Sequence, residues 1–202
     1  MKGHQEALRL LQEAELICDA ECVQREVARV AREISAELGG QFPVVLSVMG
    51  GAAIFTGQLL PQLGFPLEFG AIEVTRYNND IEGREITWRL PPRDNVRGRT
   101  VLVVDDILDE GITLAAIHKK LVEMGAKRVL SAVFADKDIG RAKPIKADLV
   151  GLTLPNEFVV GFGMDVYNYW RNLPGLWSIS QADLSAAEPE PEFPVPDAKR
   201  LD

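Results

Sequence analysis

The segment VLVVDDILDEGITL, residues 101–114, constrains the fold of this 202-residue chain more than any other stretch. It opens with four consecutive apolar residues, and such a short uninterrupted run is typical of a strand buried on both faces. Four acidic residues follow at once: Asp105, Asp106, Asp109 and Glu110. Gly111 then precedes a segment whose apolar residues have helical spacing. The stretch therefore predicts a buried strand, a polar turn and a helix in succession.

The same alternation recurs along the chain. Helical spacing marks residues 20–38 and 113–126, and uninterrupted apolar runs over 44–49 and 128–135 predict further buried strands. Strands that alternate with helices indicate an α/β fold, with a mostly parallel central sheet flanked by helices. Ligands of such sheets bind at the carboxyl ends of the strands. The loops that the pattern places at this edge are 49–51, 105–113 and 136–138.

The length of the chain and the composition of its last residues predict one folded domain. A chain of 202 residues is long enough for one domain with a substantial core and too short for two large ones. From residue 182 onward the sequence is rich in proline and acid, a composition typical of disorder. We therefore expect a single folded domain over residues 1–181 and a disordered tail over 182–202.

The net charge of the chain and the lengths of its apolar runs argue against binding to nucleic acid and against insertion into a membrane. The formal net charge of −8 disfavours binding to nucleic acid, because the chain would repel the phosphate backbone. No apolar run approaches the ~20 residues of a membrane span, and the first ten residues lack the apolar core of a secretory signal. Cys18 and Cys22 have too few neighbouring ligands for a metal site, so we expect a reduced pair in a cytoplasmic protein.

The acidic strand end is compatible with four kinds of site. A Walker B strand requires a partner G-x-x-x-x-G-K-[ST] motif, which the sequence does not contain. The segment GFGMDV, residues 161–166, offers two glycines of a dinucleotide motif without the third. A receiver domain would carry its acidic pair at the first strand, whereas here the pair falls mid-chain. A sugar-phosphate site fits the residues best.

Each part of the turn suits one part of a sugar phosphate. Carboxylates are pure acceptors, so Asp105 and Asp106 can bind both hydroxyls of a ribose. Gly111 permits a tight turn, and the helix that begins near Thr113 directs its first amides at a phosphate. Acidic groups repel phosphates, so we expect a divalent cation, Mg²⁺, between them. A solvated strand end for the acids and a plain N-cap for Thr113 are the structural alternatives.

These residues resemble a known family. The segment at 101–114 resembles the phosphoribosyl-diphosphate signature of the type I phosphoribosyltransferases. The pair DK at 136–137 and the segment PNEFVVGFGMDVYNYWRNLPGLWSI at 155–179 are similar to the hypoxanthine-guanine phosphoribosyltransferases. The likeness covers about residues 14–179. It implies that the N-terminal part and residues 150–179 form a small hood over the sheet, and that the protein is a homodimer or homotetramer.

The resemblance also implies roles for individual residues. Asp109 would be the general base or acid at purine N7. Lys137 would donate to the 6-oxo group, Phe158 would stack on the base, and the Val159 backbone would read its edge. The residues that would bind phosphoribosyl diphosphate are Met49, Gly50, Gly51, Asp105, Asp106, Glu110, Gly111, Ile112, Thr113 and Arg171. The residues that would hold Mg²⁺ are Asp165, Asp105 and Asp106.

Some of these positions have plain alternatives. Lys137 could be a surface lysine, Phe158 a core aromatic, and Asp165 and Arg171 a surface ion pair.

The family also implies a cis peptide bond at Val48–Met49. It implies a mobile loop, residues 76–88, that contains Arg76 and Tyr77 and closes over the site.

Four residues depart from the family pattern. Glu110 stands where Ser or Thr is usual, Ile112 where Lys also occurs, and Met49 where a positively charged residue is usual. We expect Glu110 to turn outward and Arg76, which replaces a typical Ser, to supply the missing positive charge.

The resemblance thus implies a purine-salvage enzyme. It would transfer phosphoribose from phosphoribosyl diphosphate to hypoxanthine or guanine, giving IMP or GMP and pyrophosphate with Mg²⁺. Two alternatives remain open at this point: a catalytically weak regulator or sensor of the same fold, and a phosphoribosyltransferase that prefers xanthine.

Overall fold

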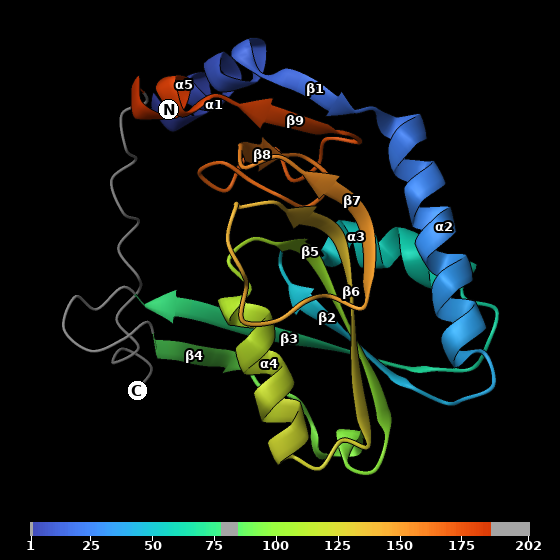
Figure 1. The fold of residues 1–202 in the computed structure, drawn as a ribbon. Coiled ribbons are helices and arrows are strands. Elements are labelled where there is room, and N and C mark those ends of the chain that lie inside the picture. Colours follow the sequence, from blue (N-terminus) through green and yellow to red (C-terminus); the bar gives the residue numbers. More distant parts are fainter. Residues whose placement is uncertain (1, 78–84, 187–202) are drawn as a thin grey trace, which may run out of the picture.

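A six-stranded sheet forms the centre of the molecule (Figure 1). The structure is a computed structural model that describes residues 2–77 and 85–186. The spatial order of the sheet is β4-β3-β2-β5-β6-β7, and every pairing is parallel except that between β3 and the edge strand β4. Its strands are β2 (Val44–Met49), β3 (Glu68–Tyr77), β4 (Glu85–Leu90), β5 (Thr100–Leu108), β6 (Arg128–Lys137) and β7 (Leu149–Leu154). The predicted α/β fold with a mostly parallel sheet is confirmed.

Helices cover both faces of this sheet because alternate residues of each strand point to opposite faces. In β5, Leu102 and Val104 pack with the apolar faces of α2 (Ala20–Leu38) and α3 (Ala53–Leu59). Val101 and Val103 pack instead with α4 (Ile112–Glu123). All four side chains are buried, which explains the uninterrupted apolar run. Short 3₁₀ turns occupy Leu60–Gln62 and Asp94–Val96.

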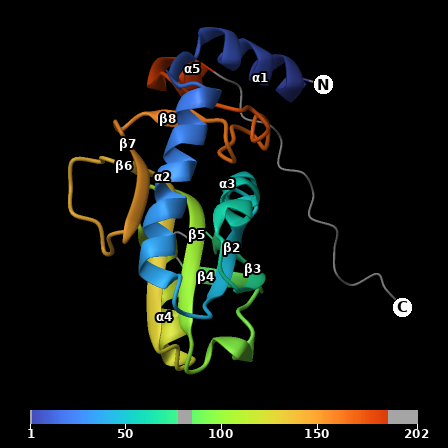
Figure 2. The ribbon, with the colours of Figure 1, turned by 90° about the vertical axis from the view of Figure 1, so that its right-hand side faces the viewer.

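A second sheet forms the hood, which lies beyond one end of the large sheet (Figure 2). Its order is β1-β9-β8, and both pairings are antiparallel. The elements of the hood are α1 (Lys2–Glu13), β1 (Glu15–Cys18), β8 (Phe158–Val160), β9 (Leu176–Ile179) and α5 (Gln181–Ala186). Leu10, Val160, Val166 and Ile179 form its own small core. The Trp170 indole N–H donates to the Ala7 carbonyl at 2.7 Å and so ties a hood loop to α1.

Several boundaries differ from the expectations. The predicted start of the hood at residue 150 falls inside β7, which belongs to the large sheet. Strand β5 continues to Leu108 because Ile107 and Leu108 still pair with β6, so the acidic pair lies within the strand. Residues 182–186 of the expected tail are helical in α5, and residues 187–202 lie outside the described part.

The expectation of reduced cysteines is wrong: Cys18 and Cys22 form a disulfide. Cys18 ends β1 and Cys22 lies in the first turn of α2, and this strand-to-helix turn brings their Cα atoms to 5.5 Å, a normal separation for a disulfide. Among the described residues, no helix has the length and apolar character of a membrane span.

Candidate active site

One cavity of about 310 Å³ opens at the carboxyl ends of β2 and β5 and at the first turn of α4. It brings together most of the residues that the sequence pointed to for a sugar phosphate. Those residues are Met49, Gly50, Gly51, Asp105, Asp106, Asp109, Gly111, Thr113 and Arg171. The lining residues that the sequence reasoning missed are Val48, Val74, Ile107, Leu108 and Leu114. These are apolar strand and helix positions, and no local pattern separates them from ordinary core residues.

The acidic pair lies at the floor of this cavity. Asp105 is only 8% exposed, and its Oδ1 accepts the backbone N–H of Asp106 at 3.0 Å. Asp106 Oδ1 in turn accepts the N–H of Ile107 at 3.0 Å. Loss of solvation raises the pKa of Asp106, opposed by a hydrogen bond with Asp105, the Ile107 N–H and the charge of Arg171. These contacts exclude the alternative of a solvated strand end.

The wall next to Asp106 is made of main chain. A Cβ at Gly51 would overlap the Asp106 carboxylate, and a Cβ at Gly163 would overlap the Gly51 carbonyl. Gly163 also has a φ of +104°, which favours glycine. Its neighbour Phe162 is fully buried and packs on Phe134 with ring centroids 4.4 Å apart. Phe162 therefore fixes the hood loop to the core.

A cis peptide bond lies between Met49 and Gly50. We expected it one bond earlier, at Val48–Met49, so that expectation is corrected. Val48 is instead the last buried residue of β2, where its side chain packs in the core shared with α4.

Lys137 reaches the site through Asp109. It is the last residue of β6, is 8% exposed, and its Nζ lies 3.2 Å from Asp109 Oδ2. Lys137 is therefore a buried, ion-paired lysine, which excludes the alternative of a surface lysine. Asp109 follows β5 directly and lines the cavity.

Arg171 and Asp165 form an ion pair. Arg171 Nη2 lies 2.5 Å from Asp165 Oδ1, and Nη1 donates to the Gly163 carbonyl at 2.6 Å. Asp165 Oδ2 also accepts the Asn168 N–H at 2.8 Å. Arg171 lines the cavity whereas Asp165 does not. Asp165 therefore orients Arg171 and is not brought together with Asp105 and Asp106.

The donor set suits an ion that takes few protein ligands. Within residues 2–77 and 85–186, no three His, Cys, Asp or Glu side chains gather closely enough to hold a metal alone. Asp105 and Asp106 provide two carboxylates, which is what a Mg²⁺ shared with substrate phosphates requires.

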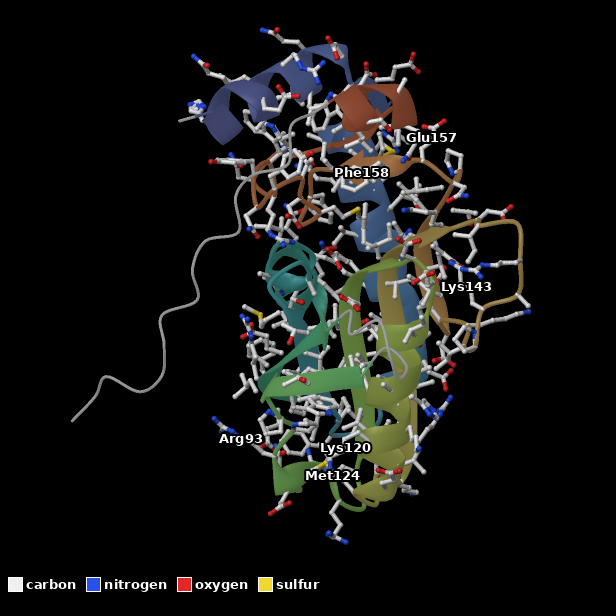
Figure 3. All side chains as sticks on the ribbon, turned by 90° about the vertical axis from the view of Figure 1, so that its left-hand side faces the viewer. Arg93, Lys120, Met124, Lys143, Glu157 and Phe158 are labelled. Carbon is white, nitrogen blue, oxygen red and sulfur yellow. A yellow bond between two sulfur atoms is a disulfide. The ribbon has the colours of Figure 1, made fainter. Side chains whose placement is uncertain are left out.

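Like Lys137 and Asp165, four other predicted residues lie away from the cavity lining. Phe158 and Val159 belong to β8; Val159 is buried, and Phe158 packs against the small core of the hood (Figure 3). Ile112 begins α4 without lining the cavity. Glu110 does not line the cavity, and its Oε1 accepts from Arg141 Nη2 at 3.1 Å.

The expected mobile loop, residues 76–88, is too long: residues 85–88 belong to strand β4, which pairs with β3. Arg76 and Tyr77 end β3, but their side chains lie outside the described part, as do residues 78–84.

Comparisons with known proteins agree with this geometry. The family described as phosphoribosyl transferase domain matches residues 15–166. A hypoxanthine-guanine phosphoribosyltransferase of Bacillus subtilis is 33% identical over 168 residues, which are 83% of this chain and 93% of that protein. A bifunctional protein TilS/HprT of Listeria innocua is 37% identical over 153 residues; the match covers 75% of this chain but spans only 24% of that protein.

Solved structures have the same fold. A crystal structure of a hypoxanthine-guanine phosphoribosyltransferase from Bacillus anthracis superposes with a TM-score of 0.77 at 28% identity, covering 82% of this chain and 98% of that one.

Proposed function

Because this chain belongs to the phosphoribosyltransferase family, and within it to the hypoxanthine-guanine phosphoribosyltransferases, we propose that it catalyses purine salvage in the cytoplasm. It would transfer phosphoribose from phosphoribosyl diphosphate to hypoxanthine or guanine, giving IMP or GMP and pyrophosphate. The observation that carries the proposal is that one cavity gathers the vicinal carboxylates Asp105 and Asp106, Asp109, the first turn of α4 and Arg171.

The cavity provides a separate contact for each part of the sugar phosphate. Asp105 and Asp106 accept from the ribose hydroxyls. The 5′-phosphate binds at the first turn of α4, where Gly111 has a φ of +80° and, as the N-cap, has no side chain that could cover the helix amides. Arg171 lines the same cavity and binds the pyrophosphate group, held in place by Asp165 and the Gly163 carbonyl.

Asp105 and Asp106 would also hold Mg²⁺ together with oxygens of the substrate. When bound, the ion supplies positive charge that offsets the charge of the leaving pyrophosphate.

The reaction needs one proton to move. Purine N9 forms a bond to C1 of the ribose as the bond from C1 to the pyrophosphate oxygen breaks. The Asp109 carboxylate accepts the proton that N7 carries, and later releases it to solvent. Lys137 is an ammonium with donors only, so it suits a 6-oxo group and cannot accept from a 6-amino group.

The first test is turnover of the purified protein with phosphoribosyl diphosphate, Mg²⁺ and each of hypoxanthine, guanine, xanthine and adenine, followed by pyrophosphate release. We expect turnover with 6-oxopurines and a fall of ~10²-fold or more in Asp109→Asn. A strong preference for xanthine would select that alternative. Absence of turnover with every base, together with retained binding of phosphoribosyl diphosphate, would select the regulator. Sedimentation of the same sample tests the proposed homodimer or homotetramer.

A further inference from the structure

Glu110 places a carboxylate beside the proposed phosphate subsite. It directly precedes Gly111, the residue at which the chain turns into α4. A carboxylate directed at the 5′-phosphate would repel it, and the repulsion would be strong in a partly dehydrated cavity. The site therefore requires the Glu110 side chain to be directed elsewhere.

The structure shows where that side chain goes. Asp109 and Gly111, its two neighbours, line the cavity, whereas Glu110 does not. Its Oε1 accepts from Arg141 Nη2 at 3.1 Å, and Arg141 belongs to the loop of residues 138–148 between β6 and β7. The Glu110 carboxylate thus points away from the proposed phosphate subsite and toward a positive charge.

This loop packs against the turn between β5 and α4, residues 109–111, which we call the phosphate turn. Lys143, labelled in Figure 3, has a side chain that is only 10% exposed; it donates to Asp136 Oδ1 at 2.5 Å and to the Leu108 carbonyl at 2.6 Å. A Cβ at Gly111 would lie 3.3 Å from Pro144 Cδ, so the loop packs directly on the turn.

A tight turn just before Arg141 presents it to Glu110. Asp138 Oδ1 accepts the Gly140 N–H at 2.9 Å, and Gly140 has a φ of +68°. The chain therefore bends at Gly140, the residue that precedes Arg141.

We propose that Arg141 is a positioning residue for phosphoribosyl diphosphate: it holds the Glu110 carboxylate out of the 5′-phosphate subsite. This inference rests on the proposed function. The Arg141 side chain is 69% exposed, and an ion pair of that kind adds little to stability. Loss of Arg141 should therefore weaken substrate binding without weakening the fold.

The test is a set of steady-state and binding measurements on Arg141→Ala, Arg141→Lys, Glu110→Gln and the double variant Glu110→Gln/Arg141→Ala. In Arg141→Ala, KM for phosphoribosyl diphosphate should rise roughly five- to tenfold, with kcat, KM for the purine and Tm little changed. Arg141→Lys should recover most of the loss. The rise should shrink in 0.5 M NaCl, because salt screens the repulsion. Arg128→Ala, which breaks an exposed pair with Glu37 remote from the site, is the matched control.

The double variant decides the mechanism. If Arg141 acts through Glu110, its removal should cost less than twofold once Glu110 is neutral. An equal rise in KM in both backgrounds, or no rise in Arg141→Ala, would overturn the proposal. Calorimetric titration with phosphoribosyl diphosphate and Mg²⁺ gives the same comparison without turnover. A wild-type protein that binds this ligand but shows no turnover would contradict the proposed enzyme reaction and leave the proposed role of Arg141 open to the binding test. A wild-type protein that neither turns over nor binds it rejects both proposals.

Discussion

Lys137 Nζ lies 3.2 Å from Asp109 Oδ2, so the two groups proposed to act on the purine are ion-paired with each other. Purine N7 and the 6-oxo group are neighbours on one edge of the base. A carboxylate and an ammonium side by side can therefore engage that edge together: Asp109 at N7 and Lys137 at the 6-oxo group. The pair also keeps the buried lysine charge compensated when no base is bound.

Lys137→Met should weaken the discrimination between 6-oxo and 6-amino purines. The change removes the donor that selects the oxo group, so the ratio of kcat/KM for hypoxanthine over adenine should fall by about 10-fold or more. The measurement is pyrophosphate release with each base. Lys119→Met, on the exposed side of α4, is the control and should keep the ratio. An unchanged ratio in Lys137→Met would remove Lys137 from base recognition.

Gly51→Ala should disable the site through a steric effect. The added methyl group would overlap the Asp106 carboxylate and displace it, and a displacement near 1 Å can cost about 10²-fold in kcat/KM. Gly57→Ala is the same change in α3, where nothing lies within 4 Å of the new Cβ. That variant should retain activity and gain roughly 0.5–1 kcal/mol of stability, because alanine favours helix. Kinetics and thermal melts of the pair separate the two effects; equal activity would contradict the close contact.

Asp106→Asn should lower the activity and raise the thermal stability. Desolvation of the Asp106 carboxylate raises its pKa, which means that the ionised side chain destabilises the folded state. A neutral amide still accepts the Ile107 N–H and avoids that cost, so at neutral pH Tm should rise by roughly 2–4 °C. Activity should fall by about 10²-fold, since the ribose hydroxyls and Mg²⁺ lose a carboxylate. Asp94→Asn, at an exposed position, should change neither quantity appreciably.

The raised pKa of Asp106 also predicts a pH dependence of binding. A raised pKa keeps the carboxyl protonated to a higher pH than usual, so affinity for phosphoribosyl diphosphate with Mg²⁺ should be lost as pH falls through that pKa. In the same range the Tm advantage of Asp106→Asn should shrink, because the protonated carboxyl carries no charge to desolvate. The measurement is the affinity of wild type and Asp106→Asn for the ligand at several pH values across pH 4–8. The ligand itself also titrates, but it affects both proteins equally, so the difference between their curves reports on Asp106. Parallel curves for the two proteins would contradict the shifted pKa.

Local pattern was sufficient for the inner strands β2, β5 and β6 and for the turn between β5 and α4, whereas the edge strands β4 and β7 were not predicted. The run before Asp105 and the glycine before α4 lie next to each other in sequence, so their arrangement is encoded locally. The hood strands were not predicted because each has three or four residues and pairs with a distant partner, as Glu15 does with Ser178. The pair between Glu110 and Arg141 depends likewise on how a loop 31 residues away folds back.

The contact between Gly163 and Gly51 has a mechanical consequence. Gly163 belongs to the hood and Gly51 to the turn after β2, and their main chains touch with no side chain between them. A side chain could absorb a displacement by changing rotamer, but two touching backbones cannot. A displacement of the hood at Gly163 would therefore reach Gly51 directly, and through Gly51 the Asp106 carboxylate that lies against it.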